Sequence, residues 1–162
     1  MVVIAVIALM LGLVSAALAR SRQVARTAVC AASLKQIGTL VEIYLNDSKG
    51  TMPTLYNRAT TADPQPAIDT ALSAKEDSDG IMDCPADDRK IFEISGTSYF
   101  WNFTVNGQKV DTMFSIMGGR DLVRIPLVSD KEGWHPELDP RVNILYADTH
   151  VSQQLNFSVS LP

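Results

Sequence analysis

The sequence predicts an α+β fold in which one long N-terminal helix packs on an antiparallel sheet of about four strands. Two observations support this prediction. Apolar residues dominate the start of the chain and then recur at helical spacing up to Tyr44, whereas segments rich in aromatic and β-branched residues occur only beyond residue 97. The length of 162 residues leaves room for the helix and one domain. A helix with one apolar face can cover such a sheet in two layers.

The first nineteen residues, Met1 to Ala19, contain no charged side chain. As an α-helix they would extend about 28 Å, which is close to the thickness of the hydrocarbon core of a bilayer. Positive charge follows at Arg20, Arg22 and Arg26. We therefore expect a membrane-spanning segment with an arginine collar at the level of the lipid headgroups.

The helical pattern continues past the arginines with apolar residues on one face: Val24, Ala28, Ala31, Leu34, Ile37, Val41 and Tyr44. The turn-forming string from Asn46 to Gly50, followed by Pro53, predicts the end of the helix. We accordingly divide the chain into an apolar segment, 1–23, and a domain, 24–162, that includes the amphipathic half of the helix.

The apolar start has more than one interpretation. Ala17-Leu18-Ala19 has the small-x-small form of a signal-peptidase site, which would leave Arg20 as the first mature residue. No Lys or Arg precedes the run, however, and the helical stripe continues through this site. A plain membrane anchor is also long enough, and the positive-inside rule would then keep the domain in the cytoplasm.

The segment after the helix predicts an irregular connection followed by strands. Pro64 and Pro66 forbid a regular helix in 51–80, although 67–75 could form a short one. The expected strands are 97–105, 122–128, 142–147 and 150–155. The first returns through Asn106-Gly107 as a hairpin with 108–110, and the last follows a turn at Asp148-Thr149. Pro126 predicts an edge position or a break in the second strand. We expect alternate residues among Tyr99, Phe100, Trp101 and Phe103 to pack on the helix.

The two cysteines, Cys30 and Cys84, occur in neither a CxxC nor a Cys/His metal spacing. Cys30 lies on the predicted helix and Cys84 in a turn-like stretch. Outside the cytoplasm a disulfide between them would tie that loop to the helix. Two buried free thiols are the alternative, and the sequence leaves both open.

The residue pattern gives little support for catalysis or nucleic-acid binding. His135 and His150 have acidic residues nearby, namely Asp130, Glu132, Asp139 and Asp148, but no nucleophile-elbow or metalloprotease motif accompanies them. We expect no enzyme and no resident cofactor. The acidic residues could bind Ca²⁺, although no Asp-x-Asp-x-Gly string is present and solvated acids are the simpler interpretation. A net charge of −4 without a basic cluster disfavours nucleic acid as a partner.

Several motifs resemble one family. The apolar run Val2 to Ala8 and the string from Leu18 to Arg26 are similar to the N-terminal helix of type IV pilins and type II secretion pseudopilins. More specific matches to one pseudopilin-like branch are Cys30, Leu34-Lys35-Gln36-Ile37-Gly38, Tyr44-Leu45-Asn46-Asp47, Cys84-Pro85-Ala86-Asp87 and Ala147-Asp148-Thr149-His150-Val151. Thr149 replaces the glycine usual in that branch, which leaves the turn type open because a β-branched residue tolerates positive φ poorly. The family's basic leader, its Phe-Thr-Leu-x-Glu segment and its N-methylated residue have no counterpart in this sequence.

The resemblance implies a pilin-like fold and a structural subunit that polymerises into a type IV pilus-like filament or a type II secretion pseudopilus. The implied partners are further copies, other pilins or pseudopilins, the assembly machinery and, before assembly, the inner membrane; the implied destination is the periplasm or the cell surface. The residues expected on the assembly helix are Val3, Ile4, Ile7, Leu11, Val14 and Leu18, while Arg20, Arg22 and Arg26 could pair with acids on neighbours. Some major pseudopilins hold calcium in a C-terminal loop, which keeps Ca²⁺ open. The alternative function is a membrane-anchored or secreted binding domain that never polymerises, with an enzyme third.

Overall fold

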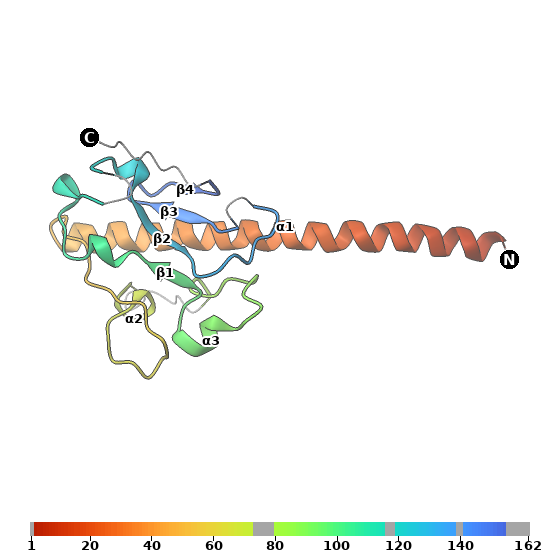
Figure 1. Cartoon of the computed structure of the whole chain (residues 1–162), viewed down its shortest axis with the longest axis horizontal. Helices are drawn as coiled ribbons and strands as arrows, with labels where there is room; N and C mark the ends of the chain where they lie inside the picture. The colour runs from red at the N-terminus through yellow and green to blue at the C-terminus, as the bar shows by residue number, and fades with distance from the viewer. Residues whose placement is uncertain (1, 73–79, 116–118, 139–140, 155–162) are drawn as a thin grey trace.

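A computed structural model describes residues 2–72, 80–115, 119–138 and 141–154. One continuous helix, α1 (Val2–Asp47), runs through the molecule, and the rest of the chain gathers along its C-terminal half (Figure 1). The other elements are α2 (Ile68–Leu72), α3 (Ile91–Ser95), β1 (Tyr99–Trp101), β2 (Pro126–Asp130), β3 (Ile144–Tyr146), β4 (Val151–Ser152) and the 3-10 turns η2 (Phe103–Val105), η3 (Val110–Thr112) and η4 (Leu122–Arg124). The predicted α+β fold, a long N-terminal helix with a four-stranded antiparallel sheet, is confirmed.

The helix ends where the sequence predicts. The Gly50 amide donates to the carbonyl of Leu45 at 2.8 Å, and the Ser48 amide donates to that of Tyr44 at 2.9 Å. Gly50 has a φ of 74°, a left-handed conformation that costs glycine little. These bonds satisfy the last helical carbonyls and turn the chain back toward the sheet.

The sheet has the order β1-β2-β3-β4 with every neighbouring pair antiparallel. Strand β2 is therefore internal, and the predicted edge position for Pro126 is wrong. The alternative of a break is correct, because β2 begins at Pro126 and its register with β3 shifts between Pro126 and Val128. The first position of a strand tolerates a residue that has no amide hydrogen. Residues 122–124 form η4 instead of the predicted strand.

The predicted hairpin at Asn106-Gly107 is wrong. Strand β1 ends at Trp101, and the side chain of Asn102 caps η2 by accepting from the amide of Thr104. The Asn106 side chain instead accepts from the Trp101 indole nitrogen at 2.7 Å and from the Leu55 amide at 3.2 Å. Lys109 then bridges to Thr51, directly after the helix. An Asn-Gly pair indicates a turn, but it does not say which segment receives the returning chain.

The core lies between the C-terminal half of α1 and the sheet. Helix residues Cys30, Leu34, Ile37, Leu40 and Val41 are buried together with sheet residues Tyr99, Trp101, Leu127, Val128 and Leu145. In the predicted aromatic run, Tyr99 and Trp101 face the core, whereas Phe100 and Phe103 are exposed. Val24 and Ala28 of the predicted apolar face are also exposed, so the covered face begins later than the periodicity indicates.

The β3–β4 turn approaches the helix closely. A side chain at Gly38 would place its Cβ 3.1 Å from a methyl carbon of Leu145, so the glycine allows β3 to pack near the helix backbone. Thr149 takes a φ of 65° despite its branched side chain. Its carbonyl accepts from the Lys35 ammonium at 2.7 Å, so a helix residue helps to hold this unusual turn in place.

Candidate functional site: an uncovered apolar helix and the clasp at its base

The N-terminal half of α1 projects beyond the domain, and only its last turns lie beside the domain loops (Figure 1). The predicted assembly residues Val3, Ile4, Ile7, Leu11, Val14 and Leu18 are each between 52% and 70% exposed. Monomeric soluble proteins rarely expose contiguous apolar surface of this extent. We call the segment from Val2 to Arg26 the bare half of α1.

By length and composition α1 is able to cross a membrane. A signal sequence and the core helix of a soluble protein can pass the same test. The bare half differs from a core helix because its described side chains, apart from the half-buried Gln23, are exposed rather than covered. Arg20, Arg22 and Arg26 are likewise exposed and lie where the bare half reaches the domain.

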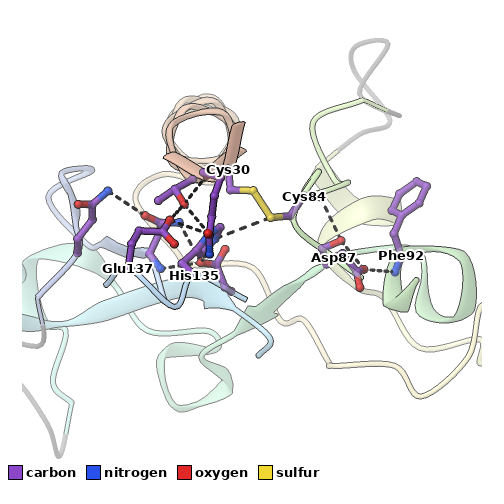
Figure 2. Close-up of a disulfide and its surroundings, with 12 residues drawn as sticks. Cys30, Cys84, Asp87, Phe92, His135 and Glu137 are labelled. Atoms are coloured by element: carbon purple, nitrogen blue, oxygen red, sulfur yellow. Dashed lines mark hydrogen bonds and ion pairs between the residues drawn. A yellow bond between two sulfur atoms is a disulfide. The ribbon is translucent and has the colours of Figure 1, made fainter. Parts of the chain in front are cut away.

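A disulfide fastens the helix to the domain just beyond the bare half. The sulfur atoms of Cys30 and Cys84 are bonded, with 5.1 Å between their Cα atoms, and both residues are buried. Figure 2 shows the bridge running from the helix to the loop that carries Cys84. Of the two states that the sequence leaves open, the structure therefore has the bridge. Disulfides persist in oxidising compartments, which points away from the cytoplasm.

Polar residues join the helix to the sheet at the same level (Figure 2). The Thr27 hydroxyl oxygen lies 2.8 Å from His135 Nδ1 and also bonds to the carboxylate of Glu137. On the other side of the imidazole, His135 Nε2 lies 3.1 Å from a carboxylate oxygen of Asp130. That oxygen accepts from the backbone and side-chain amides of Asn143, at 2.6 and 3.0 Å. We call these five residues the polar clasp.

The sequence predicts only some of the residues of the polar clasp. His135 and Asp130 are among the predicted polar residues, whereas Thr27, Glu137 and Asn143 are not. Thr27 and His135 are separated by 108 positions, so no local spacing indicates that they meet. Thr27 is the first buried side chain among the described side chains of α1.

The order hydroxyl, imidazole and carboxylate in the polar clasp is formally that of a hydrolytic triad. Thr27, His135 and Asp130 are only 3%, 1% and 3% exposed, however, and the threonine hydroxyl is already shared with Glu137. A substrate carbonyl would need access to that oxygen. The geometry instead suits a fixed connection between helix and sheet.

His150 takes part in a different structure. Its ring stacks on Tyr146 with centroids 4.5 Å apart, and its Nδ1 lies 2.5 Å from an oxygen of Asp148. Glu132 pairs with Arg89 at 2.8 Å, and Asp139 lies outside the described residues. The acidic residues considered for catalysis or calcium are thus engaged in separate contacts in the part of the chain that the structure describes.

One group of metal-ligating residue types occurs among the described residues. The ligand atoms of Cys30, Cys84 and His135 all lie within 4.8 Å of one another. Both sulfur atoms are bonded to each other, so neither is available as a thiolate ligand. In this structure the group is therefore a disulfide beside a histidine.

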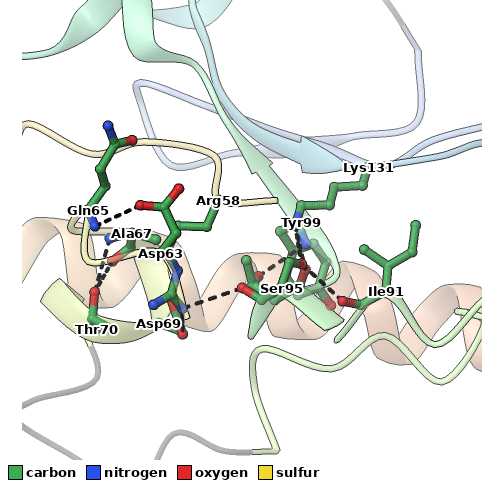
Figure 3. A network of polar contacts seen from close by, with 11 residues as sticks. Arg58, Asp63, Gln65, Ala67, Asp69, Thr70, Ile91, Ser95, Tyr99 and Lys131 are labelled. Carbon is green, nitrogen blue, oxygen red and sulfur yellow. Dashed lines mark hydrogen bonds and ion pairs between the residues drawn. The ribbon is translucent and has the colours of Figure 1, made fainter. Parts of the chain in front are cut away.

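A second polar network holds the segments on the outer side of β1 (Figure 3). Arg58 forms an ion pair with Asp69 and donates to the carbonyl of Ser95 at 3.3 Å. The Lys131 ammonium donates to the Ser95 hydroxyl at 2.6 Å and to the carbonyl of Thr97 at 2.8 Å. Desolvation by burial lowers the pKa of Lys131. The network joins the irregular connection, α3 and the end of β2, and we assign it a structural role.

Comparison of the chain with models of protein families, with curated proteins and with solved structures finds no match.

Proposed function

We propose that this chain is a structural subunit of a pilin-like or pseudopilin filament and that it polymerises through the bare half of α1. One observation carries the proposal: exposed Val, Ile and Leu side chains cover a helix segment that is continuous with the helix of the folded domain. Full burial of one such side chain stabilises by about 1.5–3 kcal/mol. A surface of this kind needs either lipid or other protein around it.

Two successive states of the subunit account for both environments, lipid and protein. Before assembly, lipid tails surround the bare half. During assembly, the same side chains of neighbouring copies pack against one another in a central helical bundle. The domain cannot enter that bundle because it is fixed to the second half of α1, and it therefore lies on the outside of the filament. The resemblance of the N-terminal and Cys-Pro-Ala-Asp motifs to pilins and pseudopilins supports the same model.

The disulfide and the polar clasp contribute a fixed attachment. They hold two loops at one level of the helix, at Thr27 and Cys30, so every copy would present its domain at the same height. The disulfide also supports a location outside the cytoplasm, with the bare half in the inner membrane before assembly. Arg20, Arg22 and Arg26 would meet lipid headgroups in that state and acidic groups of neighbours in the filament.

The direct test compares Leu11→Asp and Ile7→Asp with the matched variant Leu11→Met. An aspartate at the centre of the bare half should abolish filaments, because a charge there opposes both lipid and helix packing. Leu11→Met keeps the volume and the apolar character and should assemble normally. Electron microscopy of sheared surface material would count filaments, and circular dichroism of each purified full-length variant in detergent would check that the domain folds.

Assembly must be separated from membrane anchoring. A variant that carries both Ile4→Cys and Leu11→Cys should form disulfide-linked multimers on oxidation if neighbouring helices pack together. These multimers would appear as a ladder of bands. A membrane-anchored binding domain that never polymerises would give only monomers. Normal filaments from Leu11→Asp, or an absence of multimers from cells that secrete the protein, would contradict the proposal.

A further inference from the structure

The base of the domain contains a groove beside the emerging helix. It encloses about 630 Å³ and lies between the last turns of the bare half and two loops of the domain. The helix contributes Arg22 and Arg26; the loop after Cys84 contributes Asp88 and Arg89; and the segment after β2 contributes Glu132 and Trp134. We call this hollow the foot groove.

The walls of the foot groove are held in place independently of any ligand. The loop with Arg89 is tied to the helix by the Cys30–Cys84 disulfide, a few residues before it. The segment with Trp134 is tied to the helix through the contact of the next residue, His135, with Thr27. Both connections lie within about three helical turns of Arg22. The groove is therefore a preformed feature of the fold.

Two of the three arginines in the foot groove have no ionic partner among the described residues. Arg89 is paired with Glu132 at 2.8 Å. Arg22 and Arg26 lie four positions apart on one helix face, and no ion pair or hydrogen bond joins either of them to another described residue. Asp88 is the remaining acid among the lining residues. Three arginines face two acids, so the groove has a net positive charge that favours an anion.

Trp134 adds a hydrogen-bond donor. Its indole nitrogen is buried and has no hydrogen-bond partner among the described residues, although the residue lines the groove. A buried N–H group without a partner is costly. A phosphate oxygen could accept from this nitrogen, while two guanidinium groups supply charge-assisted bonds to the other oxygens.

The position of the foot groove along α1 indicates the source of the phosphate that it would bind. If residues 2–19 cross the hydrocarbon, they extend about 27 Å, and the groove begins at Ala19, at the depth of the headgroups. Tryptophan and arginine are both favoured at that depth. A lipid phosphate is therefore held next to the groove by the membrane itself.

We propose that the foot groove binds the phosphate of an anionic phospholipid, held by Arg22 and Arg26 with the Trp134 indole as a further donor. The inference depends on the proposed insertion of α1 into a membrane. It assigns the groove a task before assembly, namely to fix the depth and orientation of the subunit on the membrane surface. Release of the lipid would then accompany entry into the filament.

The test uses the full chain in nanodiscs that contain equal amounts of phosphatidylglycerol and phosphatidylcholine. Native mass spectrometry of the released protein should show phosphatidylglycerol retained about tenfold over phosphatidylcholine, an enrichment within reach of a few charge-assisted bonds. Arg22→Gln or Arg26→Gln should reduce the enrichment at least about threefold. Arg20→Gln removes the same charge from a headgroup-level residue that does not line the groove. It reports general attraction to headgroups and should reduce the enrichment less than either groove variant.

A second readout locates the lipid. The chain has two tryptophans, and Trp101 is fully buried in the core. Brominated phosphatidylglycerol should therefore quench the fluorescence of the wild type but not that of Trp134→Phe. Equal loss of enrichment in Arg20→Gln and Arg22→Gln would indicate diffuse attraction and would overturn the inference. So would full competition by millimolar inorganic phosphate or glycerol phosphate, which would identify a site for free anions.

The proposed insertion of α1 into the membrane is measured separately. Resistance of every variant to alkaline carbonate extraction reports insertion of the bare half. A chain that inserts but shows no preference for phosphatidylglycerol refutes the groove assignment and leaves the filament proposal standing. A chain that does not insert refutes both. In nanodiscs, cross-links from Arg26→Cys to another chain would show that a second copy occupies the groove. The partner would then be a protein instead of a lipid, which would overturn the inference.

Discussion

The two halves of α1 have the same secondary structure and opposite surroundings. The described apolar side chains of the bare half are exposed, whereas the half from Thr27 to Asp47 buries Leu34, Ile37 and Val41 against the sheet. The boundary between them is abrupt. Arg26 is exposed, Thr27 belongs to the polar clasp, and Cys30 carries the disulfide.

This difference shows that helix continuity and domain membership are separate properties. The covered half is part of a cooperative fold, so its side chains contribute to the free energy of unfolding of the domain. The described apolar side chains of the bare half have no such cover among the described residues, so we expect them to contribute only when lipid or another copy surrounds them. Matched substitutions in the two halves should therefore affect different measurements.

The largest expected effect on stability comes from the disulfide. The bridge closes a loop with a sequence separation of 54, for which the loop-entropy model gives about 4 kcal/mol. The double variant Cys30→Ser/Cys84→Ser should lower the free energy of unfolding by about this amount, measured by urea titration of residues 27–162. A double variant as stable as the wild type would show that packing alone fixes the loop to the helix.

Two leucines on the same helix sharpen the comparison. Leu34 is fully buried and Leu11 is 62% exposed. Leu34→Ala should reduce the free energy of unfolding by about 2–5 kcal/mol because it leaves a cavity in the core. Leu11→Ala should leave the same urea transition of the domain unchanged in the full chain in detergent. A similar loss in both variants would mean that the bare half folds against the domain in solution.

The sequence predicts the covered half well and its boundary poorly. Leu34, Ile37 and Val41 follow helical spacing, and burial at such positions needs only a cover somewhere along the face. Val24 and Ala28 fit the same spacing but are exposed, because the extent of the cover depends on where the disulfide and His135 loops meet the helix. Those contacts are long-range, and helix periodicity contains no information about them.

The polar residues at the base were only partly predictable. The cysteine pair could be proposed because only two cysteines are present. Thr27 could not be singled out, since a threonine in a helix usually faces solvent or bonds to its own backbone. The hairpin predicted at Asn106 is wrong for a related reason: the side-chain amide of Asn106 forms bonds with Leu55 and Trp101 that are set by the tertiary structure.

A smaller effect is expected where the clasp meets the helix. Thr27→Val keeps the side-chain shape but removes the hydroxyl that contacts His135 and Glu137. We expect a loss of about 1–3 kcal/mol in the free energy of unfolding, because buried polar groups lose a partner. Thr39→Val is the control, since Thr39 is exposed and, among the described residues, its hydroxyl bonds only to the carbonyl of Lys35. Equal effects of the two substitutions would assign the change to helix propensity instead of the clasp.

The smallest expected effect lies in the loop that holds the helix. Partial desolvation raises the pKa of Asp83 above 3.8, and the charges of Asp87 and Glu93 add to the shift. The folded state therefore binds more protons than the unfolded state in the window above 3.8, and this group's contribution to stability is lost as the pH rises through it. Asp83→Asn should then raise the melting temperature at pH 7 by about 1–2 °C, a small gain because the residue is exposed. The gain should disappear below pH 3.8, where the aspartate is also neutral. A gain that persists at low pH would show that the asparagine acts through packing or hydrogen bonding, and that the loop that fastens α1 carries no electrostatic cost.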